Sequence, residues 1–215
     1  MEKLAARNAS QVLDVLSGRL AFERTGVKLY DAAIQKIERN PEPRYHRLLD
    51  YLRLIRHEEK EHEEWLEAQI RSLGGTAHET TTMSELETEE SKGVVAVIVD
   101  GHQQVPHLLH ALLAAELADN AGWELLVKLA DDAGDRDAKR QFQRRLLDEV
   151  KHLAFLREAV VRATEIEVLG RDLEMPESAA SVVRRVATRP LAIGVLTFGL
   201  IGAGVAVAAA IRASR

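Results

Sequence analysis

The sequence predicts an all-α protein, an antiparallel four-helix bundle of two helical hairpins joined by a long crossover, followed by a C-terminal transmembrane helix. Of its 215 residues, 46% are hydrophobic but only 4% are aromatic, so Leu, Ala, Val and Ile must fill a helical core. Five prolines and 13 glycines provide few of the turns that a β protein needs. The stretch 191–211 contains no charged residue and, at ~1.5 Å per residue, is long enough to cross a ~30 Å hydrocarbon core.

Four long amphipathic segments are predicted as the helices of the bundle. They span Ala9–Arg39, Arg44–Leu73, Pro106–Ala133 and Asp135–Leu169. Pro41, Gly74 and Gly170 mark the ends of the first, second and fourth segments. Short turns join the first to the second and the third to the fourth, so each pair is expected to form an antiparallel hairpin. The longer link 74–105 holds one apolar patch, Val94–Val99, expected to be a short helix or extended piece lying across the bundle.

The distribution of charge predicts three parts of the chain: a bundle over 1–172, a basic linker over 173–190 and a tail anchor over 191–211. Three arginines precede the tail and two follow it, so the positive-inside tendency places the bundle on the cytoplasmic face of a membrane. No secretory signal is expected, since the first ten residues are polar. The absence of cysteine excludes disulfides and thiolate metal sites, and the net charge of −5 argues against nucleic acid as a partner.

Polar residues interrupt the apolar stripe of the second predicted helix. Steps of three and four residues from Ile55 to Leu66 place positions 59 and 62 on the buried face, and these positions hold Glu59 and His62. A buried charged group costs several kcal/mol unless it is paired or binds a metal ion. The pattern therefore indicates a specific buried polar site.

The other three helices show matching interruptions. Glu149 and His152 repeat the Glu-x-x-His spacing on the fourth helix, and lone glutamates Glu23 and Glu116 occupy the buried stripes of the first and third. Each lone glutamate is followed seven residues later by an aromatic residue, Tyr30 after Glu23 and Trp123 after Glu116. The sequence thus describes two related hairpins, each with a glutamate, an aromatic residue and Glu-x-x-His.

Four carboxylates and two imidazoles are the donor set of a four-helix di-iron or di-manganese site. Oxygen and imidazole donors without thiolate suit two iron ions, with manganese as the alternative. The competing interpretation is a solvated, charged helix face. We therefore predict a site for two metal ions with these six ligands: Glu23, Glu59, His62, Glu116, Glu149 and His152.

Three stretches resemble the ferritin/rubrerythrin-like di-iron carboxylate superfamily over roughly 9–169. They are RLAFERTG at 19–26, HEEKEH at 57–62 and AELADNAGWE at 115–124. The resemblance implies a ferritin-like bundle with the same six ligands, Glu59 and Glu149 bridging the metals. It also implies that Tyr30 stands beside the centre, where it gives an electron or holds a hydrogen bond. The chain departs from rubrerythrins in lacking the cysteine-ligated iron, and from cage-forming ferritins in its apolar tail.

Other polar residues near the predicted site have less specific interpretations. Asp119 and Asn120 follow Glu116 by one turn; a surface or inter-helix hydrogen bond is favoured over a role as extra ligands. Three histidines at the start of the third helix are interpreted as surface residues rather than an iron-uptake site: His102, His107 and His110.

The leading functional hypothesis is a membrane-anchored di-iron or di-manganese oxidoreductase that oxidises Fe(II) with O₂ or peroxide, as a ferroxidase or peroxide scavenger. A second hypothesis is a di-iron hydroxylase of a membrane quinone or lipid, which needs an apolar channel. A third is a metal-binding or structural membrane adaptor without enzymatic activity. The expected partners are the membrane, through the tail, and O₂ or peroxide, with a homo-oligomer left open.

Overall fold

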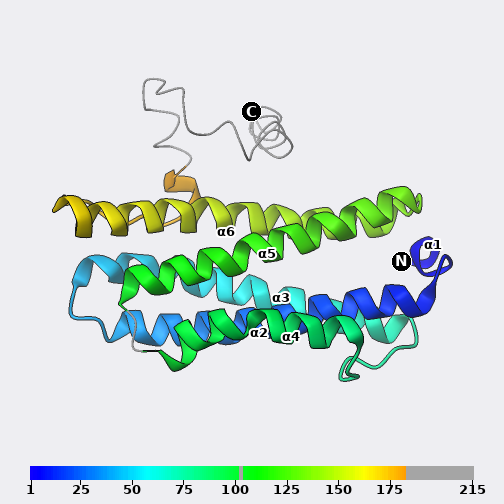
Figure 1. Cartoon of the computed structure of the whole chain (residues 1–215). Helices are drawn as coiled ribbons and strands as arrows, with labels where there is room; N and C mark the ends of the chain where they lie inside the picture. The colour runs from blue at the N-terminus through cyan, green and yellow to red at the C-terminus, as the bar shows by residue number, and fades with distance from the viewer. Residues whose placement is uncertain (102–103, 183–215) are drawn as a thin grey trace, which may run out of the picture. The chain divides into compact units, whose positions relative to one another are not determined.

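The structure is a computed structural model that describes residues 1–101 and 104–182 (Figure 1). It divides into a compact unit over Met1–Ala179 and a second unit over Ala180–Arg215, of which only residues 180–182 are described. All regular structure in the described ranges is helical. The predicted all-α class is therefore confirmed for this part of the chain.

Four long helices form the first unit. They are α2 (Ala9–Glu38), α3 (Leu49–Ser72), α5 (Val105–Asp132) and α6 (Arg136–Leu169). α2 and α3 pack together as one hairpin, and α5 and α6 as the other (Figure 1). The predicted pairing of helices is therefore correct. The second helix begins later than predicted, because Pro43–Leu48 forms the 3₁₀ helix η1 before α3.

The polar side chain of Asp135 joins the start of α6 to the N-terminal segment. Its carboxylate accepts the backbone N–H of Ala138, which caps α6, and also the backbone N–H of Leu4. Leu4 belongs to α1 (Glu2–Ala5), a short helix that the sequence did not predict. α1 therefore closes one end of the bundle through a buried hydrogen bond.

The crossover between the hairpins is more regular than expected. It contains α4 (Thr82–Val95), which runs directly into the π-helix η2 (Ala96–Asp100). Thr81 and Ser84 form a capping box at the start of α4, in which each side chain accepts the other residue's backbone N–H. α4 packs along α2 instead of forming a piece across the bundle (Figure 1).

The side chain of Lys36 in α2 caps the C-terminal end of the π-helix η2. Its ammonium donates to the carbonyl oxygens of Ile98 at 2.6 Å and Gly101 at 2.5 Å. The last carbonyls of a helix have no partner within it and must find one elsewhere. A lysine side chain from the neighbouring helix supplies that partner here.

The apolar interior consists of two clusters separated along the bundle axis. The first includes Ile37, Ile55, Leu112 and Phe155. The second includes Leu16, Leu66, Trp123 and Phe142. On each long helix the residues between these two clusters include the predicted ligands, so the polar site lies as a layer between two apolar cores.

The predicted transmembrane helix requires a correction. Within 1–101 and 104–182, no helix is both long and apolar enough to cross a membrane. The longest described helix, α6, shows the reason, because charged residues such as Arg140 and Lys151 recur along it and each costs about 2.5–3.5 kcal/mol at a bilayer centre. The expected span, 191–211, lies outside the described residues. We therefore correct the fold class to the helical bundle alone, and withdraw the membrane anchor and the location at a cytoplasmic membrane face.

Candidate metal centre

All six predicted ligands meet in the middle of the bundle. The structure places them in the layer between the two apolar cores, and none of the six residues is more than 3% exposed. Their donor atoms form two overlapping groups. Glu59, Glu116, Glu149 and His152 offer atoms that all lie within 4.8 Å of one another, as do those of Glu23, Glu59 and His62. Glu59 is common to both groups.

Glu149 also lies between the two halves of the site. One of its carboxylate oxygens is 3.1 Å from Nδ1 of His62, and the other is 3.3 Å from Nδ1 of His152. The Glu-x-x-His pairs of α3 and α6 therefore contact each other through His62 and Glu149. Glu59 and Glu149, which the resemblance places between the two metals, each lie close to residues of both hairpins.

The site holds an unusual concentration of buried polar atoms without hydrogen-bond partners. Seven such atoms belong to the predicted ligands: Glu23 Oε2, Glu59 Oε1, His62 Nδ1, Glu116 Oε2, both carboxylate oxygens of Glu149, and His152 Nδ1. Buried polar groups in folded proteins are normally satisfied. Carboxylate oxygens and imidazole nitrogens that share one space fit a pair of cations such as iron or manganese.

Two aromatic residues hold the lone glutamates in a crossed arrangement. Tyr30 OH donates to Glu116 Oε1, and Trp123 Nε1 donates to Glu23 Oε1 at 3.0 Å. Each aromatic residue follows its own hairpin's glutamate by seven positions in the sequence, but binds the glutamate of the other hairpin. These bonds leave the second oxygen of each glutamate facing the site.

Sequence reasoning missed Arg19, whose guanidinium lies inside the bundle at 4% exposure. Its Nη2 donates to Glu23 at 3.1 Å and to the buried carboxylate of Asp119. Asp119 is therefore an inter-helix partner, as favoured from the sequence. Gly122 makes room for this contact, because a Cβ there would lie 2.2 Å from Nη1 of Arg19. A polar residue one turn before Glu23 on the buried face was the available sequence signal.

Two further carboxylates contact the outer nitrogens of the histidines. Glu58 lies 2.8 Å from Nε2 of His152, and Asp148 lies 3.8 Å from Nε2 of His62. Such a partner fixes the ring orientation and leaves Nδ1 free to bind a metal. The sequence carried a signal for both, because an acidic residue directly precedes each Glu-x-x-His motif. Of the three histidines interpreted from the sequence as surface residues, His107 and His110 are exposed, as predicted, and His102 lies outside the described residues.

Burial and mutual repulsion perturb the acids of the centre. Burial and the charges of Glu149 and Glu23 hold the pKa of Glu59 well above its usual range, and burial raises the pKa of Glu116 to about 7. Burial lowers the pKa of His152, but the charges of Glu149 and Glu116 outweigh this effect and leave it well above its usual value. Without metal, protons must therefore supply the positive charge that the carboxylates require.

These pKa shifts predict how the metal-free protein responds to pH. Folded Glu116 keeps its proton up to about pH 7, whereas the unfolded chain loses it near the ordinary value of 4.5. The folded state thus binds more protons between these values, so the free energy of unfolding falls as pH rises through this window. His152, whose pKa is also raised, changes stability in the same direction. We expect metal-free protein to melt at a lower temperature at about pH 8 than at about pH 5.

Added Mn(II) provides the control for this pH prediction. Metal ligands must be deprotonated, so metal affinity rises with pH and the stabilisation by Mn(II) should be larger at about pH 8. Thermal unfolding with chelator and with Mn(II) at both pH values measures the two trends. A metal-free protein that becomes more stable towards alkaline pH would contradict the charge balance assigned to this centre.

Substitution of Gly26 is expected to weaken metal binding without lowering the stability of the metal-free protein. A Cβ at this position would lie 2.8 Å from Oε2 of Glu59. Gly26→Ala should favour the helix by up to about 1 kcal/mol but displace the Glu59 carboxylate, so weaker Mn(II) binding is expected without loss of metal-free stability. Mn(II) titration and thermal unfolding measure the two quantities. Gly93→Ala, where no atom lies within 4 Å of a new Cβ, is the matched control and should leave binding unchanged.

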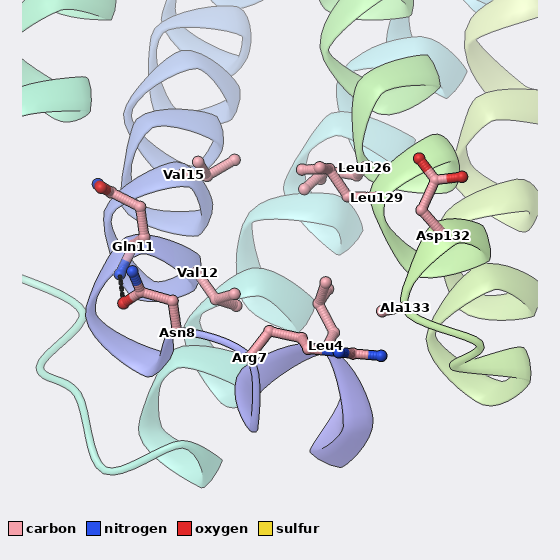
Figure 2. Close-up of a pocket in the computed structure, with 10 residues that line it drawn as sticks. All are labelled: Leu4, Arg7, Asn8, Gln11, Val12, Val15, Leu126, Leu129, Asp132 and Ala133. Carbon is pink, nitrogen blue, oxygen red and sulfur yellow. Dashed lines mark hydrogen bonds between the residues drawn. The ribbon is translucent and has the colours of Figure 1, made fainter.

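Two cavities differ in their relation to the centre. The polar cavity, of about 420 Å³, lies between α3 and α6 and is lined by His62, Trp65, Arg145 and Asp148, among others. The apolar cavity, of about 370 Å³, lies at the α1 end (Figure 2). There Val12 and Val15 of α2 face Leu126 and Leu129 of α5, and none of the six predicted ligands lines it. The polar cavity is thus the one in contact with the centre.

Comparison with known proteins identifies the fold. No protein-family model and no curated protein matches the chain. A ferritin-like, diiron-carboxylate protein from Bacillus anthracis str. Ames matches with a TM-score of 0.56 and 16% identity, over 70% of this chain and 96% of that chain. Dps from Thermosynechococcus elongatus matches with a TM-score of 0.56 and 17% identity, over 70% and 90% respectively. The chain therefore has the ferritin-like fold that the sequence resemblance predicted.

Proposed function

We propose that this ferritin-like bundle binds two iron ions, with manganese as the alternative, and oxidises Fe(II) with O₂ or peroxide. The observation that most supports the proposal is the set of seven buried, unpartnered donor atoms contributed by six side chains to one space. A stabilising role alone would favour satisfied polar groups or apolar side chains at these positions. The solved structures with this fold include one described as a diiron-carboxylate protein.

The arrangement suggests a distribution of ligands between two metal positions. Glu23 and His62 would hold one ion, and Glu116 and His152 the other. Glu59 and Glu149 would lie between them, since each contacts both halves. A pair of iron ions held in this way supplies the electrons for reduction of O₂ or peroxide.

The remaining residues of the site act by holding these ligands in place. Arg19 and Trp123 both donate to Oε1 of Glu23, which leaves its Oε2 for a metal. Tyr30 does the same for Glu116. The two apolar cores on either side keep bulk water from the carboxylates, which strengthens their attraction to cations.

The positions of the polar and apolar cavities support Fe(II) oxidation more than hydroxylation of an apolar substrate. A lipid or quinone hydroxylase needs an apolar space at the metal centre, but the apolar cavity is not lined by any of the six ligands. The polar cavity contacts His62 and suits small polar reactants such as peroxide. The non-enzymatic alternative, a metal-binding protein without turnover, is separated by the experiment below.

Anaerobic loading of the full chain with Fe(II), followed by elemental analysis, tests metal binding. We expect about two iron ions per chain. Oxygen uptake and peroxide consumption after mixing then test oxidation. Absence of both iron and manganese after loading would refute the metal site, whereas bound iron without consumption of either oxidant would leave a metal-binding protein and refute the oxidase.

Tyr30→Phe tests whether the phenol at the centre assists oxidation. The substitution removes the donor to Glu116 but keeps the ring, so metal content should stay the same. We expect Fe(II) oxidation to slow by about tenfold, which corresponds to a barrier increase of about 1.4 kcal/mol. Stopped-flow absorbance at matched iron content measures the rate. Equal rates in the two proteins would assign Tyr30 to packing alone.

A further inference from the structure

The two tryptophans of the chain lie next to each other, beginning at the metal centre. Trp123 is fully buried and donates to Glu23, and its ring lies 5.5 Å from that of His62, centroid to centroid. Trp65 is the next ring outward, with its centroid 6.3 Å from that of Trp123. Phe142 packs against both indoles. Two oxidisable rings therefore form a continuous contact from a predicted ligand outward.

The outer tryptophan reaches the polar cavity. Trp65 is half-buried and lines this cavity together with Arg144 and Arg145. The guanidinium of Arg145 lies over the Trp65 ring, 3.6 Å from its centroid. Burial lowers the pKa of Arg145 to about 10, although the charges of Glu23 and Asp148 oppose this shift. The lining of the cavity also carries three carboxylates, of Glu61, Glu64 and Asp148, so a small polar molecule that enters it meets charges of both signs.

We propose that Trp123 and Trp65 form an electron relay that carries a surplus oxidising equivalent from the metal centre to a small polar one-electron reductant at the polar cavity. The relay rests on the proposed function. It is needed when hydrogen peroxide, which takes two electrons, meets a centre that can supply only one. Without an exit, the second oxidising equivalent would damage the buried site.

The reaction balances with one Fe(II) and one indole as donors. One H₂O₂ takes one electron from Fe(II) and one from Trp123, and with two protons gives two waters, Fe(III) and the Trp123 cation radical. Trp65 then returns an electron to Trp123 and releases its own N–H proton to the cavity. An ascorbate-type reductant restores Trp65 by giving one electron and one proton, and leaves as its own radical.

The surroundings of the two rings agree with this direction of transfer. The positive charge of Arg145 disfavours a lasting cation on Trp65, so loss of the proton to the cavity and rapid reduction are favoured there. Tyr30 also touches the centre, through Glu116, but its ring has no aromatic neighbour among the described residues that could pass the electron on. Trp123 is therefore the aromatic contact of the centre that leads outward.

The test loads the full chain with one Fe(II) per chain, adds one equivalent of H₂O₂, and locates oxygen additions by peptide mass spectrometry. We expect oxidation at Trp65, suppressed by ascorbate, and a tryptophan radical by freeze-quench electron paramagnetic resonance. Trp123→Phe should abolish the iron-dependent oxidation of Trp65. Trp65→Phe should transfer the oxidation to Trp123 and remove the protection by ascorbate. Tyr51→Phe, at a ring packed on Phe155 instead, is the control and should change nothing.

The outcomes of this test distinguish a failure of the relay from a failure of the proposed function. Iron content and peroxide consumption are measured in the same samples, and absence of either refutes the oxidase and the relay together. If iron is bound and peroxide consumed, equal oxidation of Trp65 in Trp123→Phe or in iron-free protein overturns the relay alone. If Trp123→Phe does not fold, Trp65→Phe provides the test, because position 65 is half-buried and tolerates a smaller ring. Unchanged protection of this variant by ascorbate would overturn the relay.

Discussion

Glu149→Ala is expected to remove most of the bound metal. Its carboxylate reaches towards both histidines, so its loss takes a donor from both metal positions at once. Loss of a partner that only orients a ligand already costs about 10–100-fold in metal affinity, and loss of a shared ligand should cost more. Elemental analysis after anaerobic Fe(II) loading, at equal protein concentration, measures the effect.

The control for this prediction is Glu149→Gln, which keeps the shape but not the charge. It should also lose metal, because a neutral amide is a poor substitute for a carboxylate between two cations. Glu64→Ala, at an exposed position of α3 two residues beyond His62, should retain metal. A Glu149→Ala protein that binds as much iron as the unaltered chain would show that the cluster is not the binding site.

The candidate site could be predicted because its residues break a regular pattern. Each of the six lies on a buried helix stripe where spacing alone demands an apolar residue, so Glu59 and His62 between Ile55 and Leu66 stand out without any three-dimensional information. The structure buries all of these positions. The pairing of helices followed from the short turns in the same way. Local periodicity and connection length are properties that a single sequence displays directly.

What the sequence did not predict depends on the register between helices. Tyr30 and Trp123 bond to the glutamate of the opposite hairpin, and no spacing within one hairpin reveals this exchange. Arg19 was missed for the same reason, because its partner Asp119 is 100 positions away. α4 was missed for another reason: its first turn carries a capping box, but its polar composition lacks a strong apolar stripe.

Arg19→Leu is expected to destabilise the fold strongly. The guanidinium and its partner Asp119 are almost completely buried, at 4% and 2% side-chain exposure. Removing one member of a buried ion pair leaves the other charge uncompensated, which typically costs about 3–5 kcal/mol. Glu23 also loses a donor, so weaker metal binding should accompany the loss of stability. Chemical denaturation of metal-free protein measures the first effect separately from the second.

The double variant Arg19→Leu/Asp119→Leu distinguishes a buried charge from a lost contact. If the cost of Arg19→Leu comes mainly from the uncompensated Asp119 carboxylate, removing that carboxylate as well should recover much of the stability. Metal binding should not recover, because Glu23 still lacks the Arg19 donor and keeps only Trp123. Recovery of stability without recovery of metal affinity would show that this ion pair is kept for the position of Glu23. Recovery of both would mean that Arg19 serves only to neutralise Asp119.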